Sequence, residues 1–395
     1  MISVEQATHI IQSISFPWPT KSIPLPDALG EILAEDILAD RDLPPYDRVT
    51  MDGIAIDFDR FDPARPFRRQ TIVRAGEYPA PLQNPEDVIE VMTGAMLPPG
   101  CNTVIRYEDI IQEEETWKIV PGITIKKGQN IHTKGQDSRP SDVLVPKGTR
   151  LHPTAIGIGA SVGNDQVLVY QKPSVLIVSS GEEIVPIHQT PEAFQIRSSN
   201  SYALSAMLQP WVGKITLLHV PDDPIQMEQM LSLHWTHDII LLTGGVSAGK
   251  YDFVPGILVK LGVQKHLQRV AQKPGKPIWF GTTEKNQAVF ALPGNPASSI
   301  LCTVRYVLPW IQQQFGMAPT QEEAILSESF HHHLPLTYFL QVTLFVKDGK
   351  TWAIPTPGNG SGDLVNLARV DGFLEIPPGE CTFEAGTVFP LWRSK

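Results

Sequence analysis

The chain has 395 residues, enough for two to three domains at about 150 residues each, and its 32 Lys and Arg against 42 Asp and Glu give a formal net charge of −10. An acidic surface repels the phosphate backbone of nucleic acid, so a general nucleic-acid binder is excluded. No apolar stretch approaches the ~18 residues of a membrane-spanning helix and residues 1–14 lack a secretory-signal pattern, which predicts a cytoplasmic protein without a membrane partner.

The first predicted element is a helix that begins after Ser3, a residue type favoured at N-caps. Its apolar residues recur at helical spacing: Val4, Ala7, Ile10, Ile11 and Ile14. From residue 43 to about 131, short apolar runs such as 88–92 and 103–106 are broken by Pro, Gly and Asn. This pattern predicts a small β-rich domain. Residues 157–163 do not complete the GxGxxG pattern of a dinucleotide site, and we expect a loop there.

Between residues 170 and 315, strand-like runs alternate with helix-like segments. The four strand candidates are residues 174–178, 214–219, 238–242 and 287–291. One helix follows Asp223, with Pro224 suited to its first position. A second follows Pro296, with an apolar face made of Ile300, Val304, Val307, Leu308 and Ile311. The alternation predicts a parallel sheet covered by helices, with ligands at the carboxyl ends of its strands.

After residue 319 no further helix is predicted. Apolar and polar residues alternate over 338–346, and residues 347–350 form a turn that leads into another strand. A C-terminal β domain is therefore expected. The three consecutive histidines at 331–333 resemble a metal-binding tract, but they lack partner ligands at a useful spacing, so a metal site is not favoured there.

Three loops fall where the parallel sheet should bind a ligand: residues 179–183, 243–249 and 292–296. Glycine allows close approach of the backbone, and N–H groups at a helix start attract anions, so phosphate or another oxyanion is the natural ligand. The alternative is that each glycine only makes a turn from strand to helix. Residues 244–250 also fit the first seven positions of a P-loop, but Tyr251 stands where that loop needs a small hydroxyl for Mg²⁺.

Two cations, Lys273 and Lys276, lie on a segment stiffened by two prolines. Close to the glycine-rich loops they would clamp a phosphate or a molybdate-like dianion. The alternative is an ordinary solvated turn.

Carboxylates gather near the predicted strand ends at Glu183, Asp222 and Asp252. In proteins Mg²⁺ typically bridges one or two carboxylates to a substrate phosphate, so these residues are candidate ligands. Asp222 or Asp223 can instead cap the helix that follows.

Seven motifs occur in the order found in the MoeA and gephyrin E-domain family: TMDG at 50–53, MTGA at 92–95, GQD at 135–137, SGEE at 180–183, TGGVS at 243–247, KPGKP at 273–277 and LPGNP at 292–296. The chain resembles this family from about residue 3 to the C-terminus. The resemblance implies a molybdopterin molybdenumtransferase, a transferase that inserts molybdate into adenylylated molybdopterin with Mg²⁺ and releases AMP.

The resemblance also implies a multidomain α/β fold. Its centre is a three-layer α/β domain of the molybdopterin-binding type with a parallel sheet, residues 169–318. A β-rich lid domain (43–131) and a C-terminal β-barrel-like domain (319–395) flank it, and residues 1–42 plus 132–168 form an N-terminal linking domain.

Site residues follow from the resemblance in the same way. The implied catalytic residues are Asp52, Thr93, Asp137, Glu183, Asp222, Asp252, Lys273 and Lys276. The residues implied to bind the adenylate and the pterin are Gly181, Gly244, Gly245, Ser247, Pro293, Gly294, Asn295 and Ser361. Glu183 and Asp252 are the implied Mg²⁺ site, without a decision on which acidic residue ligates the ion directly.

The family implies a homodimer in which the β-rich domain of one subunit completes the site of the other, and a transient contact with the molybdopterin adenylyltransferase. Two departures from its pattern stand out: His132 replaces a frequent arginine, and Lys250 replaces a frequent glutamate. The neutral imidazole would hold phosphate less firmly than a guanidinium.

Two alternative functions remain. The related adenylyltransferase shares the GGVS and PGNP loops, but the extra β domains at both ends argue against it. A non-enzymatic molybdopterin-binding scaffold is opposed by the retained Asp52, Glu183, Asp252 and both lysines.

Overall fold

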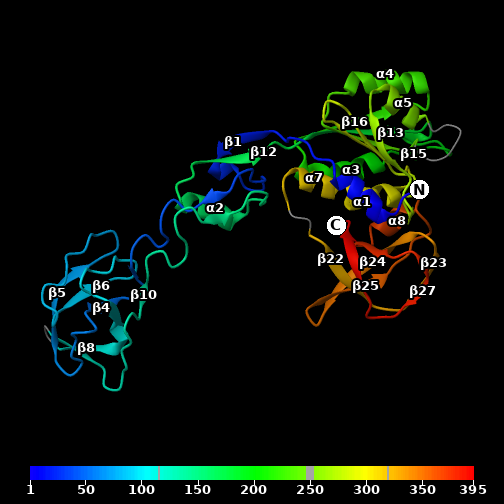
Figure 1. Cartoon of the computed structure of the whole chain (residues 1–395). Coiled ribbons are helices and arrows are strands. Elements are labelled where there is room, and N and C mark those ends of the chain that lie inside the picture. The colour runs from blue at the N-terminus through cyan, green and yellow to red at the C-terminus, as the bar shows by residue number, and fades with distance from the viewer. Residues whose placement is uncertain (114–115, 246–252, 318–319) are drawn as a thin grey trace. The chain divides into compact units, whose positions relative to one another are not determined.

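The computed structural model describes residues 1–113, 116–245, 253–317 and 320–395. The chain divides into two compact units: unit 1 comprises Met1–Ser22 and Leu168–Lys395, and unit 2 comprises Ile23–Val167. It passes from one unit to the other within β1 (Thr20–Pro24) and β12 (Gln166–Tyr170) (Figure 1). Within the described residues, no helix combines the length and the apolar character that a membrane span requires.

Unit 2 contains a six-stranded sheet in the β-rich region. Its order is β7 (Thr103–Arg106), β4 (Gly53–Ile56), β6 (Val88–Val91), β5 (Phe67–Val73), β9 (Thr116–Ile119) and β8 (Ile110–Glu113). The central strands β4 and β6 are buried on both faces: in β4, Ile54 and Ile56 pack into one apolar cluster and Ala55 packs into another. Strands buried on both sides read as continuous apolar runs, which is why β6 and β7 are found where the sequence predicts them.

The remainder of unit 2 has two short antiparallel pairs, β3 (Arg48–Val49) with β10 (Ile131–His132) and β2 (Ile37–Leu38) with β11 (Val143–Val145). It also has the 3₁₀ turns η1 (Leu25–Asp27) and η2 (Tyr107–Asp109). The loop expected over 157–163 is wrong, because α2 (Pro153–Ser161) occupies most of it. Gly159 packs the helix so closely on Leu25 that a Cβ would lie 3.1 Å from that side chain, and this packing offsets the low helix propensity of glycine.

Unit 1 is built on a six-stranded sheet. Its order is β16 (Lys214–Val220), β13 (Ser174–Ser180), β17 (Ile239–Thr243), β21 (Ala288–Leu292), β20 (Trp279–Thr282) and β18 (Gln264–Gln268). The first four strands are parallel, which confirms the predicted parallel sheet. Strand β20 runs antiparallel to both of its neighbours, so the sheet as a whole is mixed.

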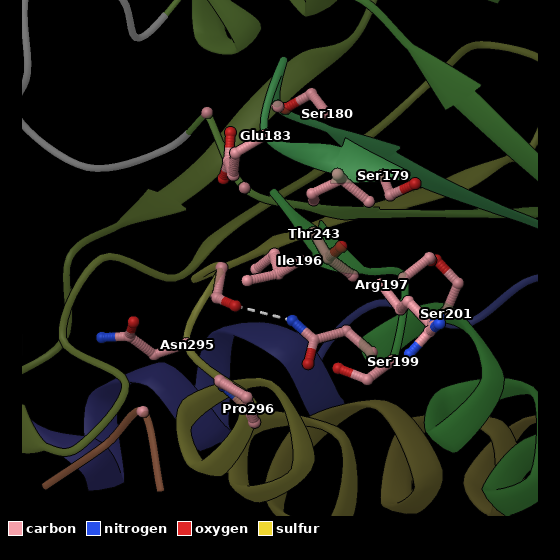
Figure 2. A pocket seen from close by; sticks show the side chains of 18 of the residues that line it. Ser179, Ser180, Glu183, Ile196, Arg197, Ser199, Ser201, Thr243, Asn295 and Pro296 are labelled. Carbon is pink, nitrogen blue, oxygen red and sulfur yellow. Dashed lines mark hydrogen bonds between the residues drawn. The ribbon is translucent and has the colours of Figure 1, made fainter. Parts of the chain in front are cut away.

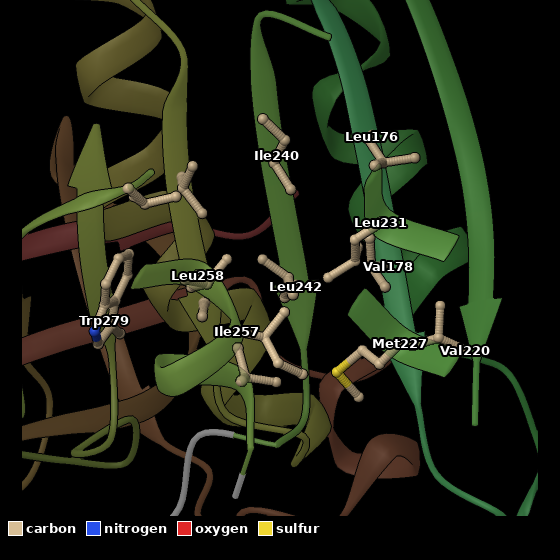
Figure 3. Close-up of a cluster of buried hydrophobic side chains, with 14 residues drawn as sticks. Leu176, Val178, Val220, Met227, Leu231, Ile240, Leu242, Ile257, Leu258 and Trp279 are labelled. Atoms are coloured by element: carbon tan, nitrogen blue, oxygen red, sulfur yellow. The ribbon is translucent and has the colours of Figure 1, made fainter. Parts of the chain in front are cut away.

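Helices cover both faces of this sheet in three layers (Figure 1). On one face α4 (Pro224–His234) and α5 (Val254–Lys260) pack on alternate strand residues, so that Met227 and Ile257 contact a cluster containing Val178 and Leu242 (Figure 3). On the other face lie α3 (Asn200–Leu208), followed by the 3₁₀ turn η3 (Gln209–Trp211), and α6 (Pro296–Cys302). The central layer therefore places the carboxyl ends of its parallel strands at one edge.

The helix predicted after Pro296 is made of three segments: α6, the π-helical turn η4 (Thr303–Val307) and α7 (Leu308–Gln314). It is not amphipathic as expected, because residues 301–307 are all buried between the sheet and the C-terminal strands. The N-terminal helix α1 (Val4–Gln12) packs beside α7. Ser3 caps α1 as predicted, with Gln6 completing a capping box, and the helix ends before Ile14.

The C-terminal region is a closed five-stranded barrel. Its strands are β22 (Glu322–Leu326), β24 (Thr337–Lys347), β25 (Lys350–Pro355), β26 (Gly372–Ile376) and β28 (Val388–Arg393), and the β24–β26 pairing closes it. The predicted turn joins β24 to β25, with φ positive at both Asp348 and Gly349. The expectation of no further helix fails at α8 (Leu364–Leu367), a single turn capped by Asp363.

Four further short strands of unit 1 form two pairs: β14 (Ile184–Val185) pairs with β15 (Ile196–Arg197), and β23 (Phe330–Leu334) pairs with β27 (Gly379–Phe383). The histidines at 331–333 lie in β23, where His332 Nε2 is 2.9 Å from Leu336 O. Within the described part of the chain, no group of three or more His, Cys, Asp or Glu side chains is arranged to hold a metal ion.

Candidate active site

The three glycine-containing loops come together at one end of the unit 1 sheet. Strands β13, β17 and β21 are adjacent and parallel, and they end before Gly181, Gly244 and Gly294. All three glycines line a cavity of about 710 Å³. The prediction that these loops share a ligand-binding edge is consistent with this geometry.

Backbone conformation and close packing between the loops explain why glycine stands at position 244. Gly244 has φ +100°, and a Cβ there would lie 3.2 Å from Ser180 Oγ. A Cβ on Gly294 would lie 3.5 Å from the Gly244 Cα. The loop backbones thus lie directly against one another, which leaves the cavity above them open.

A serine-rich turn completes the cavity wall and was not singled out from the sequence. Residues 197–201 lead from β15 into α3, and Figure 2 shows Ser199 and Ser201 on the cavity wall facing the side that carries Asn295. The Asn200 amide donates a hydrogen bond to Gly294 O at 2.6 Å. Ser201 Oγ is buried without a hydrogen-bond partner among the described residues. The sequence pattern that could have indicated this turn is the run of Ser and Asn at the start of an apolar helix.

Two acidic side chains, Glu183 and Asp222, line the same cavity. Burial raises the pKa of Asp222, and the nearby negative charge of Glu183 raises this pKa further. The neighbouring Asp223 caps α4 by accepting a hydrogen bond from Gln226 N at 2.8 Å, so the capping alternative falls to Asp223 and leaves Asp222 at the cavity.

Four residues of the sequence analysis lie outside the described residues: Ser247, Lys250, Tyr251 and Asp252. The P-loop alternative depends on this same segment. The predicted roles of Ser247 and Asp252 therefore stay predictions.

A second cavity of about 350 Å³ lies beside the lysine segment in unit 1. Its lining includes Lys273, Lys276, Pro293, Tyr338 and Ser361. Both lysines are exposed, and neither has an ion-pair partner within the described residues. The two positive charges are thus available to an anion in this cavity.

Asn295 lines both cavities and joins the central sheet to the C-terminal barrel. Its Nδ2 donates to Ser361 Oγ at 2.8 Å. The backbone reinforces the link, because Ala297 N donates to Ser361 O at 3.1 Å. A ligand that extends from one cavity to the other would therefore pass Asn295.

The remaining predicted residues lie in unit 2. Asp52 Oδ1 accepts two hydrogen bonds from Thr93, one from Oγ1 and one from the backbone N, both at 2.6 Å. These bonds lower the pKa of Asp52 and so favour its charged form. Asp52 and Thr93, predicted to act together, are thus in direct contact.

Asp137 belongs to a chain of three side chains in unit 2. His132 Nε2 lies 2.8 Å from Asp137 Oδ1, and Arg48 Nη2 lies 3.0 Å from His132 Nδ1. Because a guanidinium can only donate, His132 accepts at Nδ1 and donates from Nε2. Position 132 thus carries a histidine and not the frequent arginine, but the paired strand supplies a guanidinium beside it, because Arg48 lies opposite His132.

Three family descriptions match consecutive parts of the chain: the MoeA N-terminal region (domain I and II) over residues 2–163, the probable molybdopterin binding domain over 176–313, and the MoeA C-terminal region (domain IV) over 323–393. The first and last of these are specific to one family. Together the three matches cover most of the chain.

Relatives of known name match over the whole length. The molybdopterin molybdenumtransferase of Synechocystis sp. is 37% identical, covering 99% of this chain and 100% of the relative. That of Synechococcus elongatus is 35% identical over 94% of each chain. A crystal structure of a molybdopterin biosynthesis MoeA protein from Pyrococcus horikoshii is 27% identical, with a TM-score of 0.81 over 100% of this chain and 99% of that one. The chain therefore belongs to the molybdopterin molybdenumtransferase family, the MoeA enzymes of molybdenum cofactor biosynthesis.

Proposed function

We propose that this chain inserts molybdate into adenylylated molybdopterin in an Mg²⁺-dependent reaction that releases AMP. The observation that carries the proposal is the pair of cavities in unit 1 that share Asn295. One is lined by glycine loops and serines, and the other by two lysines. A substrate with a nucleotide at one end and a pterin at the other, joined by phosphates, fits two cavities that meet.

The larger cavity suits the nucleotide. Its volume lies within the ~300–1,000 Å³ of small-molecule sites. Glycine loops expose backbone N–H groups, and the turn at residues 197–201 adds hydroxyls, so phosphate oxygens meet donors on two sides. Ser201 Oγ, buried without a partner among the described residues, is one such donor.

Lys273 and Lys276 suit the molybdate anion or the phosphate that is cleaved. Breaking the P–O bond leaves negative charge on phosphate oxygens, and fixed ammonium groups stabilise that charge more in the transition state than in the ground state. Molybdate would be the attacking oxyanion, and AMP the leaving group.

Glu183 and Asp222 fit a divalent cation by the chemistry of their oxygen donors. The pKa of Asp222 is raised first by burial and then by the negative charge of Glu183, and a bound cation would offset both effects. When bound, Mg²⁺ neutralises negative charge on the substrate phosphates. We retain Asp252 as a proposed further ligand on the basis of the sequence resemblance.

The active form is proposed to be a homodimer in which Asp52, Thr93 and Asp137 of one subunit complete the site of the other. The family resemblance supports this assignment. The adenylylated substrate must be supplied by an adenylyltransferase, so a transient contact with that enzyme is part of the proposal.

The test is to incubate the protein with adenylylated molybdopterin and Mg²⁺, with and without molybdate, and to follow AMP. We expect AMP release that depends on molybdate and on Mg²⁺. Release that is indifferent to molybdate would contradict insertion. Synthesis of adenylylated pterin from ATP would favour the adenylyltransferase alternative, and tight pterin binding without turnover would favour a scaffold.

A further inference from the structure

A buried hydrogen-bond network lies under the lysine segment of unit 1. Gln272, Cys302 and Tyr306 each have a relative exposure of 2% or less. Gln272 uses both ends of its amide: the Tyr306 hydroxyl donates to Oε1 at 2.5 Å, and Nε2 donates to Pro274 O at 3.2 Å. The network thus joins the π-helical turn η4 to the backbone between the two lysines.

The same network packs tightly against Gly275. The amide of Gln272 contacts Cys302 Sγ at 3.7 Å, and that thiol contacts Gly275 O at 3.8 Å. Gly275 has φ +90°, and a Cβ there would lie 2.6 Å from Gln272 Nε2 and 2.8 Å from Cys302 Sγ. Only glycine fits between the segment and the side chains beneath it.

Backbone contacts hold both ends of the segment. Gln272 and Lys273 form β19, which pairs with β24 in parallel register at Thr337 and Tyr338. Val270 N donates to Lys276 O at 3.0 Å. The middle of the segment, between the lysines, contacts the interior through the hydrogen bond from Gln272 to Pro274 O and through the weaker contact of Cys302 Sγ with Gly275 O.

The stability of the fold does not by itself explain why an amide side chain is buried at position 272. Apolar side chains of the same shape can replace both partners of a buried hydrogen bond with little loss of stability. Buried polar networks instead favour one conformation, because an alternative arrangement leaves their donors and acceptors unpaired. The conformation that this network selects is that of residues 273–276, which carry both lysines of the second cavity.

We propose that Gln272 and Tyr306 are positioning residues for the anion site formed by Lys273 and Lys276. The inference rests on the proposed function, which assigns these lysines to molybdate or to the cleaved phosphate. Gln272 is among the residues that line the second cavity, whereas Tyr306 is not, so Tyr306 can act on the lysines only through Gln272 and the backbone. A cationic site that is fixed before the anion arrives needs no reorganisation during the reaction, which is the condition for strong electrostatic stabilisation.

The test compares two variants with a matched control. Tyr306→Phe removes one hydroxyl, and Gln272→Leu removes the hydrogen bonds of the amide with Tyr306, Pro274 O and Cys302 Sγ. We expect kcat/KM for molybdate-dependent AMP release to fall about tenfold for Tyr306→Phe and up to about 100-fold for Gln272→Leu, as for other small displacements of reacting groups. If Gln272→Leu does not fold, Tyr306→Phe carries the test.

The control is Gln314→Leu. Gln314 is another buried glutamine, hydrogen-bonded to Ile14 O and Trp310 O in α7, and it does not line either cavity. We expect this variant to lower the melting temperature as much as the others while keeping the kinetics of the parent. An equal loss of kcat/KM in the control would overturn the proposal.

A double-variant comparison separates positioning from general destabilisation. In a Lys273→Ala, Lys276→Ala background, Tyr306→Phe should have no further effect on kcat/KM, because no ammonium group is left to position. A full additional loss in that background contradicts the proposal.

Anion titration gives a readout that does not depend on turnover. Inorganic molybdate and inorganic phosphate are titrated separately into the parent and into Tyr306→Phe. We expect at least one anion to bind about tenfold more weakly to the variant. Unchanged binding of both anions overturns the positioning role, whereas a parent that binds these anions but releases no AMP refutes the proposed function instead.

Discussion

Two carboxylates with proposed roles in the reaction, Asp52 in unit 2 and Asp222 in unit 1, have opposite surroundings. Asp52 is exposed and receives two hydrogen bonds from Thr93, which lower its pKa. Asp222 is half-buried beside Glu183, and its pKa is raised. Hydrogen bonds to a carboxylate favour its charge, whereas burial and a like charge oppose it.

The difference indicates different tasks for the two regions. Unit 2 presents a carboxylate whose charge and orientation are already fixed by its neighbour. Unit 1 presents Asp222, whose charged form is disfavoured by burial and by the nearby Glu183 and would be stabilised by a cation. The predictions below test this contrast, beginning with the largest expected effect.

Asp52→Asn and Glu183→Gln should each lower molybdate-dependent AMP release by at least about 100-fold, a loss typical for groups that act on protons or charge at a reaction centre. Each change is nearly isosteric and removes only a charge. The melting temperature, measured by calorimetry, should stay close to that of the parent. Full activity in both variants with unchanged melting would remove these residues from the reaction centre.

Mixing the two inactive chains tests whether the regions act across subunits. If a homodimer combines unit 2 of one chain with unit 1 of the other, an equimolar mixture of Asp52→Asn and Glu183→Gln contains half heterodimers with one intact site each, which gives roughly a quarter of the parent activity. The AMP assay on the mixed and re-equilibrated chains measures this. A fully active monomer by light scattering, or a mixture that stays inactive, argues against the composite site.

The lysines test whether the anion is held by unit 1. A charge-assisted hydrogen bond contributes about 1.5–3 kcal/mol, so Lys273→Ala or Lys276→Ala should weaken anion binding about 10- to 150-fold. Thermal stability should change by less than about 0.5 kcal/mol because both side chains are exposed. Isothermal titration and steady-state AMP release are measured side by side. Parent-like values in both assays would make the segment a solvated turn.

The smallest expected effect is on the free energy of unfolding, which replacing Asp52 and replacing Asp222 should change in opposite directions. A lowered pKa contributes stability above the ordinary carboxyl pKa and loses it as the pH falls through the folded-state value, so Asp52→Asn should be less stable than the parent at pH 7. A carboxyl group with a raised pKa destabilises the fold at a pH above its pKa, where the group is charged. Asp222→Asn should therefore be more stable than the parent at pH 7.

The changes in the free energy of unfolding should stay below about 1 kcal/mol for both Asp52→Asn and Asp222→Asn, because solvent screens partly exposed charges. They should also vanish in acid, below the ordinary Asp pKa of about 3.9 for Asp222 and at still lower pH for Asp52. Melting curves at neutral and acidic pH provide the measurement. Equal signs for the two variants at pH 7 would remove the contrast between the regions.

Some parts of this architecture could be predicted from the sequence because they depend on local patterns. Strands β13, β17 and β21 are buried on both faces, so each reads as an apolar run, and each ends at a glycine-containing loop. Strand β18 could not be predicted in this way, because its sequence is mostly polar and it lies at the sheet edge.

Contacts between distant segments lay beyond sequence patterns. Gln272 and Tyr306 are 34 positions apart, and Arg48 and His132 are 84 apart. No periodicity relates such pairs, since only the folded backbone brings them together. For the same reason, the position of Asn295 between two cavities could be found only from the structure, where its loop is hydrogen-bonded to Ser361.

A single-turnover experiment tests the central claim most directly. The protein is loaded with adenylylated molybdopterin, then molybdate and Mg²⁺ are added, and the AMP released and the molybdenum bound to the pterin are quantified together. The account predicts that both products appear in step, about one of each per loaded site, as a group transfer requires. Release of AMP without incorporation of molybdenum, or no release at all, would contradict it.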